Sequence, residues 1–116
     1  MLRRLRKRAE FTRAARGNRT GRSAFSLQAI ASEGEAPGVG YTVTKKTGNS
    51  PQRSRIKRRL RAAARACAAE FHPQHDYVLV GRREALGESF AKLVHDLSSS
   101  IVKVHASRAE GPRKPI

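Results

Sequence analysis

The sequence predicts an α+β domain in which helices pack on one mixed sheet. Two segments, 56–71 and 90–101, carry apolar residues at spacings of three or four, which is the period of one helix face. Two other segments, 23–30 and 39–46, alternate apolar and polar residues, which is the period of a strand. The 116 residues are the natural size of one domain, which we place at residues 1–106.

The N-terminal part is expected to hold a basic arm, a short helix and a loop. Residues 1–7 form the arm, which we expect to be extended or mobile. Apolar residues at helical spacing predict a short helix over 8–16, which ends before Gly17. The run 16–22 has three arginines among turn-forming residues and therefore predicts an exposed cationic loop.

Three strands follow from the alternating and β-rich segments. The segments 23–30 and 39–46 are separated by a turn at 33–38 that contains two glycines and a proline. We therefore expect these two strands to pair as an antiparallel hairpin. The run Tyr77–Val80 predicts a further short strand.

The longest periodic segment predicts a helix of about 20 residues, or about 30 Å. Ser50 followed by Pro51 is a start signal, and Pro73 predicts the end because the residue before proline avoids the helical region. The apolar stripe consists of Ile56, Leu60, Ala63, Ala64, Cys67 and Phe71. The opposite side carries Ser54, Arg58, Arg61 and Arg65, with Arg55, Lys57 and Arg59 on the flanks. A last amphipathic helix is expected from Leu86 to Lys103, and a disordered tail over 107–116.

The charge is large and unevenly distributed. The formal net charge is +16, and residues 45–69 contain nine basic groups and no acidic one, whereas residues 70–116 contain seven and six. Such a surplus repels itself in the folded state unless a polyanion is the usual partner. An unbalanced cationic helix face therefore predicts a nucleic-acid surface, in preference to an ordinary solvated face. A membrane surface is disfavoured because the apolar stripe is mostly alanine.

Residues for catalysis or metal binding are not apparent. The nine acidic residues are scattered, and no nucleophile has a base at a useful spacing. His72 and His75 stand beside Asp76 without a fourth ligand nearby, so we predict no metal site. The single cysteine, Cys67, cannot form an internal disulfide and fits a reducing cytosol, and no run of about 18 apolar residues could span a membrane. The aromatic residues Phe11, Phe25 and Tyr41 are candidate stacking platforms for RNA bases, although core packing is the favoured interpretation for each one taken alone.

The stretch 44–61 resembles the signature of the bacterial ribonuclease P protein subunit. In that signature a lysine pair and Gly-Asn precede an Arg-Asn-Arg helix, and here they are matched by Lys45, Lys46, Gly48, Asn49, Arg53, Ser54 and Arg55. The resemblance extends to 6–11, 25–27, 76–80 and 90–101. Ser54 stands where the family usually has asparagine, and Ala15 and Gln28 stand at two aromatic positions of the family's leader-binding cleft.

The resemblance implies a two-layer αβββαβα sandwich, related to a ribosomal protein domain, with the basic helix in a left-handed βαβ crossover. It also implies a cytoplasmic ribonucleoprotein subunit that binds the catalytic RNA and the 5′ leader of precursor tRNA. The RNA would cleave the leader with Mg²⁺, and no residue of this chain would be catalytic. No membrane and no obligate protein partner are implied. The alternative is a non-enzymatic RNA-binding or ribosomal protein, with a DNA-binding protein third.

The resemblance also assigns residues to two sites. The residues expected to bind RNA are Lys45, Lys46, Asn49, Arg53, Ser54, Arg55, Lys57, Arg58, Arg59, Arg61 and Arg65. Those expected in the leader cleft are Phe11, Phe25 and Arg13.

Overall fold

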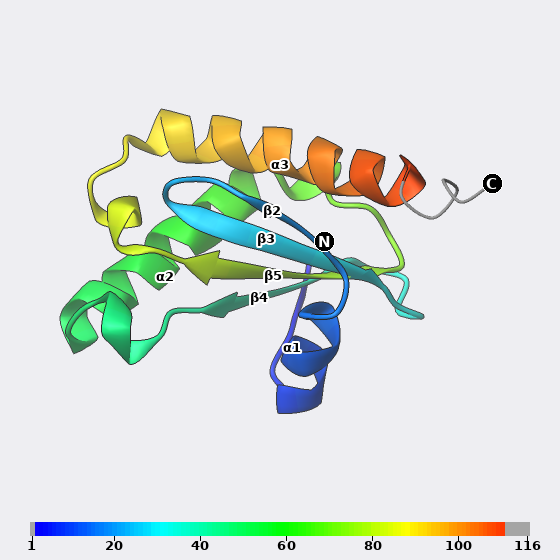
Figure 1. The fold of residues 1–116 in the computed structure, drawn as a ribbon, viewed down its shortest axis with the longest axis horizontal. Helices are drawn as coiled ribbons and strands as arrows, with labels where there is room; N and C mark the ends of the chain where they lie inside the picture. Colours follow the sequence, from blue (N-terminus) through cyan, green and yellow to red (C-terminus); the bar gives the residue numbers. More distant parts are fainter. Residues whose placement is uncertain (1, 111–116) are drawn as a thin grey trace.

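A computed structural model describes the backbone of residues 2–110 and the side chains of residues 2–106. Five strands form one mixed sheet, in the order β1-β4-β5-β3-β2 (Figure 1). The helices and strands are β1 (Arg3–Arg4), α1 (Arg8–Ala14), β2 (Asn18–Gly21), β3 (Phe25–Ala31), β4 (Gly38–Thr42), α2 (Ser50–Ala66), β5 (His75–Gly81) and α3 (Phe90–Glu110). Short 3₁₀ helices are η1 (Lys45–Thr47), η2 (Ala68–Glu70) and η3 (Arg83–Leu86). The predicted αβββαβα order is confirmed, with the two-residue strand β1 added before it.

The predicted hairpin between β3 and β4 is wrong. Strand β5 lies between them, antiparallel to β3 and parallel to β4. The physical reason is burial: Val78 and Leu79, which point to opposite faces of the sheet, are both buried, so β5 occupies the centre. Because β4 and β5 are parallel neighbours, the chain between them crosses over through α2.

The predicted cationic loop over 16–22 contains a strand instead. Strand β2 pairs antiparallel with β3, from Asn18 opposite Ala29 to Gly21 opposite Ser26. The preceding Gly17 lies so close to β3 that an added Cβ would be 2.0 Å from the Ala29 carbonyl oxygen, so only glycine fits. This strand completes the three that follow α1.

The main core lies between the sheet and the pair of helices α2 and α3. Alternate residues of β3 and β5, such as Phe25, Leu27 and Leu79, face this core and are buried. The apolar stripe predicted for α2 is confirmed, since all its members are buried from Ile56 to Phe71. Phe71 packs edge-on against Tyr77, with ring centroids 4.8 Å apart.

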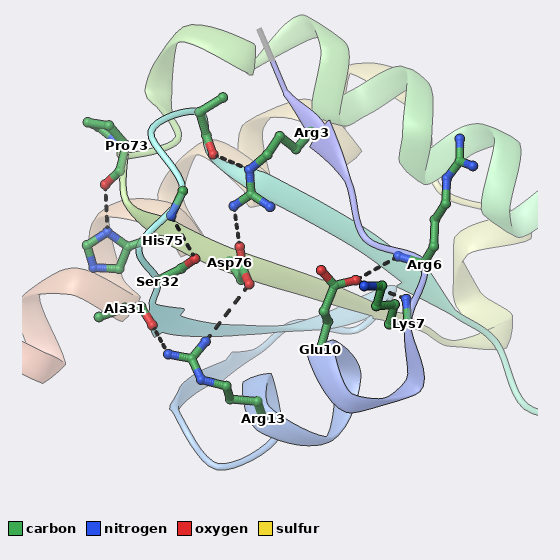
Figure 2. A network of polar contacts seen from close by, with 12 residues as sticks. Arg3, Arg6, Lys7, Glu10, Arg13, Ala31, Ser32, Pro73, His75 and Asp76 are labelled. Carbon is green, nitrogen blue, oxygen red and sulfur yellow. Dashed lines mark hydrogen bonds and ion pairs between the residues drawn. The ribbon is translucent and has the colours of Figure 1, made fainter.

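The opposite face of the sheet is covered only in part, by α1 (Figure 1). A second apolar cluster forms there from Leu5, Ala14 and Val78, with Phe11 and Val80 half-buried around it. At the start of helix α1, one carboxylate oxygen of Glu10 accepts bonds from the backbone N–H groups of Lys7 and Arg6, each at 2.9 Å (Figure 2). These two backbone bonds lower the pKa of the Glu10 carboxyl.

The ends of the helices differ from the predictions by a few residues. Helix α2 ends at Ala66, and η2 fills most of the distance to the predicted stop. Helix α3 begins at Phe90 because Ser89 accepts a bond from the backbone N–H of Lys92, which is N-cap geometry. Residues 107–110, expected in a disordered tail, continue α3, and residues 111–116 of that tail lie outside the described residues. None of the helices described here is long and apolar enough to cross a membrane.

Candidate nucleic-acid interface

Gly48 and Asn49, which follow the lysine pair, stabilise the N-terminus of α2 by hydrogen bonds. Asn49, and not the predicted Ser50, is the N-cap: its side-chain oxygen accepts from the Gln52 backbone N–H at 3.0 Å, and Gln52 returns a bond to the Asn49 N–H at 2.9 Å. Arg53 donates to the Gly48 carbonyl at 2.7 Å. Two predicted RNA contacts, Asn49 and Arg53, therefore also fix where the helix begins.

The predicted RNA-binding residues gather on the solvent-facing side of η1 and α2. We call this surface the basic ridge. Its exposed members are Lys45, Lys46, Asn49, Ser54, Arg55, Arg58 and Arg65. Its half-exposed members are Arg53, Lys57, Arg59 and Arg61.

Besides Arg53, two ridge arginines are engaged with the protein itself. Arg59 donates to the Glu88 carbonyl oxygen, which draws its guanidinium toward the η3–α3 connection. Its Nε atom is buried and has no hydrogen-bond partner within the described residues. The Arg61 guanidinium carbon lies 5.3 Å from the centroid of the Tyr41 ring, within cation–π range.

The charge of the ridge is not balanced by carboxylates. Among the residues with described side chains, ion pairs join Arg3 and Arg13 to Asp76, and Lys92 to two acids of its own segment. None of these pairs includes a residue of α2. An elongated positive surface without internal neutralisation attracts a phosphate backbone.

A groove runs between α1 and the sheet, on the face opposite to α2. We call it the α1 groove; its volume is about 300 Å³. It is lined by Arg8, Phe11, Thr12, Ala15, Gln28, Thr42, Val78 and Val80. Gly40 makes room for the aromatic side chain, because an added Cβ would lie 2.7 Å from the Phe11 Cζ atom.

The three residues expected in the leader cleft are not brought together. Phe11 lines the α1 groove, and so do Ala15 and Gln28, which stand at the family's aromatic positions. Phe25 is only 1% exposed and packs in the main core on the other face, so it cannot contact a ligand in the groove. Arg13 donates to the Ala31 carbonyl and lies 3.9 Å from the Asp76 carboxylate (Figure 2).

Sequence reasoning missed most of the groove's lining. Val78 and Val80 come from the strand-forming run 77–80, whose alternation already separates them from Tyr77 and Leu79. Arg8 and Thr12 lie one helical turn apart on α1 and share one side with Phe11 and Ala15. The alternation and the helical spacing were therefore the signals that could have found them.

The histidines form a cluster, but not a metal site. The rings of His72 and His105 stack with centroids 3.6 Å apart, and the Tyr77 hydroxyl lies 2.7 Å from Nε2 of His105. Among the described residues no group of three or more His, Cys, Asp or Glu side chains is arranged to hold a metal ion. Cys67 is buried, and burial raises the pKa of its thiol.

These features define a small, strongly basic α+β protein with a cationic helix on one face of its sheet and a groove on the other. A family model described as Ribonuclease P matches residues 2–105. The ribonuclease P protein component of Brucella suis is 39% identical over 96% of this chain and 86% of its own length, and that of Ruegeria pomeroyi is 43% identical over 90% and 87%. The chain therefore belongs to the ribonuclease P protein family.

Solved structures agree on the fold. The RNase P protein of Thermotoga maritima superimposes with a TM-score of 0.76 at 21% identity, covering 87% of this chain and 96% of that protein. The RNase P protein of Staphylococcus aureus superimposes with a TM-score of 0.72 at 25% identity, covering 87% and 95%. The predicted α+β fold class is thereby confirmed.

Proposed function

We propose that this chain is the protein subunit of a ribonuclease P ribonucleoprotein in the cytoplasm. In this role it binds the catalytic RNA and the 5′ leader of precursor tRNA, and it assists the endonucleolytic removal of the leader. Family membership supports the holoenzyme role. The observation that carries the proposal is the basic ridge, whose cations have no carboxylate partners among the described residues.

The basic ridge is proposed to bind the catalytic RNA. Arg55, Arg58 and Arg65 are exposed along one helix, so each guanidinium group can form bidentate hydrogen bonds with a phosphate. Lys45 and Lys46 extend the same charge ahead of the helix as point charges. Ser54 offers a shorter hydrogen-bonding side chain than an asparagine would.

The α1 groove is proposed to hold the single-stranded leader. Its floor is apolar, from Val78 and Val80, and Phe11 supplies an aromatic face. Stacking of a base on an aromatic side chain contributes about 1–3 kcal/mol. With alanine and glutamine at two family aromatic positions, Phe11 is proposed as the principal stacking platform, and Arg8 as the cation nearest the leader backbone.

The chain is proposed to aid catalysis without performing it. The described acidic side chains form no metal-binding group, so the residues present do not fit a Mg²⁺ site. We therefore assign the Mg²⁺ ions mainly to the RNA. A protein of charge +16 reduces the phosphate repulsion between two RNAs and thereby lowers the Mg²⁺ concentration that their association requires.

The test is cleavage of a precursor tRNA by a bacterial ribonuclease P RNA at low Mg²⁺, with and without the protein. We expect stimulation that is larger for a substrate with a long leader than for one with a single-nucleotide leader. Phe11→Ala should remove the leader-dependent part, whereas Arg58→Ala should weaken binding of the catalytic RNA. Lys103→Ala, which removes one exposed charge from α3, is the matched control. Binding without any stimulation of cleavage would instead support a non-enzymatic RNA-binding protein.

A further inference from the structure

A pocket at the edge of the sheet, between β1 and α2, is lined by four arginines, and three of them form no ion pair among the described residues. Its volume is about 210 Å³, and its lining is Leu2, Arg3, Arg4, Val39, Tyr41, Arg61 and Arg65. Arg61 and Arg65 are four residues apart and therefore project from the same side of the helix. Of the described residues, no carboxylate lines the pocket, and the guanidinium groups of Arg4, Arg61 and Arg65 have no hydrogen-bond or ion-pair partner.

The register of β1 turns Arg4 toward this pocket. Arg4 lies opposite Val39, whose side chain packs in the main core on the α2 face. Arg3 also borders the pocket, but it lies opposite Gly38, and its guanidinium bonds to the Asp76 carboxylate at 2.6 Å on the other face (Figure 2). The Arg3–Asp76 pair therefore fixes the strand, and Arg4 faces α2 because strand side chains alternate.

Tyr41 forms part of the pocket wall and positions one of the arginines. Its ring is half-buried, and the Arg61 guanidinium carbon lies 5.3 Å from the ring centroid. Burial raises the pKa of the Tyr41 phenol, while the nearby positive charges of Arg61, Arg65 and Arg4 act in the opposite direction. The charged side chains that act on the Tyr41 hydroxyl are thus all arginines.

We propose that this pocket binds one phosphate group of the RNA backbone, held jointly by Arg4, Arg61 and Arg65. This site rests on the proposed function and refines it, because it makes the N-terminal arm part of the RNA-binding surface. A phosphodiester has two free oxygens that accept from several guanidinium N–H donors at once. Three guanidinium groups without a hydrogen-bond or ion-pair partner around one small pocket therefore favour a single shared anion over three separate ones.

The test measures the affinity of a bacterial ribonuclease P RNA for the protein at several salt concentrations. Arg4→Ala should weaken binding about tenfold, the loss expected for one hydrogen bond between charged groups. The double variant Arg4→Ala/Arg61→Ala should lose less than the product of the two single losses. The logarithm of the association constant decreases linearly with the logarithm of the salt concentration. The steepness of this line should be smaller by about 0.7–0.9, the contribution of one phosphate, in the single variant and in the double variant.

A matched pair separates a shared phosphate from separate ones. Arg55 is exposed and projects from a different side of α2, so Arg4→Ala/Arg55→Ala should give multiplicative losses and a slope change of two phosphates, about 1.4–1.8. The same result for Arg4→Ala/Arg61→Ala would overturn the shared site. Wild-type affinity in the Arg4→Ala protein would also overturn the site but leave the proposed function standing. A wild-type protein that fails to bind the RNA would remove both.

The variants must be folded for these comparisons to count. Arg4 makes no hydrogen bond or ion pair within the described residues, so thermal unfolding of Arg4→Ala should match that of the wild type. The variant Arg4→Lys separates charge from hydrogen-bond geometry, because lysine keeps the positive charge but lacks the planar set of guanidinium N–H donors. It should restore most of the salt slope and only part of the affinity. If Arg4→Lys had wild-type affinity and a wild-type salt slope, the proposed guanidinium hydrogen bonds of Arg4 to the phosphate would be contradicted.

Discussion

The hydroxyl of Tyr77 makes stability depend on alkaline pH in a way that can be calculated. This side chain is 0% exposed, accepts a bond from the His72 backbone N–H at 2.8 Å, and lies 2.7 Å from Nε2 of His105. Burial raises the pKa of Tyr77 to about 12, and the bond from His72 acts in the opposite direction. In the unfolded chain a tyrosine has a pKa of about 10.

The sign of the effect follows from the two pKa values. Below pH 10 both states carry a neutral phenol, and the folded protein has its full stability. Between pH 10 and pH 12 the unfolded state loses this proton first, so stability falls as the pH rises. A difference of about two pKa units corresponds to a loss of about 2–3 kcal/mol from this residue by pH 12.

Urea unfolding of the wild type and of Tyr77→Phe, followed by circular dichroism from pH 8 to pH 12, tests this value. At pH 8 the variant should be less stable by about 1–3 kcal/mol, because the His72 N–H loses its acceptor. Between pH 10 and pH 12 this difference should shrink by about 2–3 kcal/mol. The raised pKa values of Tyr41 and Lys92 act in the same direction but are common to both proteins and cancel. A difference that stays constant from pH 8 to pH 12 would refute the reasoning.

Three further predictions concern packing, capping and the groove. Leu60→Ala, at a residue 1% exposed in the main core, should lower the free energy of unfolding by about 2–5 kcal/mol in urea, while RNA affinity of the folded fraction is retained. Asn49→Ala should cost about 1 kcal/mol because α2 loses its cap, and Ser54→Ala, on the exposed side, should cost little; equal losses would contradict the cap assignment. Gly40→Ala should displace the Phe11 ring and reduce leader-dependent stimulation of cleavage, with leader-free cleavage unchanged; an unchanged leader effect would argue against the groove.

Local patterns in the sequence were enough to predict α2 and its two faces. A helical period depends on neighbours three and four residues apart, so the stripe from Ile56 to Phe71 could be read directly, and it is buried as expected. The strand order could not be obtained in this way. Pairing of β4 with β5 joins segments separated by the whole of α2, and no local signal encodes that choice. Strand β2 has the composition of a turn, and its extended form depends on pairing with β3.

Phe25 shows how the two kinds of sequence argument can disagree. Alternation grouped it with Leu27 and Ala29 on one face of the strand, whereas family resemblance suggested the leader cleft. The structure agrees with the alternation, because that apolar face packs under α2 and α3. The groove residues Gln28 and Val78 lie on the alternate positions of the same two strands. The alternation of apolar and polar residues predicts which side chains share a face of a strand. It does not predict which face borders a groove, because that depends on where α1 packs.

Under the proposed function, the arm is where the two RNAs come closest. Arg4 faces the arginine pocket on the α2 side, whereas the next residue, Leu5, packs in the apolar cluster under α1. Only the arm therefore separates the pocket from the α1 side of the sheet at this edge. Arg6, which follows at this edge, is exposed. Because Cys67 is buried and is the only cysteine, Arg6→Cys introduces a single accessible thiol for an iron chelate. Hydroxyl radicals generated there should cut both the leader and the catalytic RNA in the ternary complex, since such radicals act only near their source. Cleavage confined to one of the two RNAs would contradict the close approach of the two RNAs at the arm.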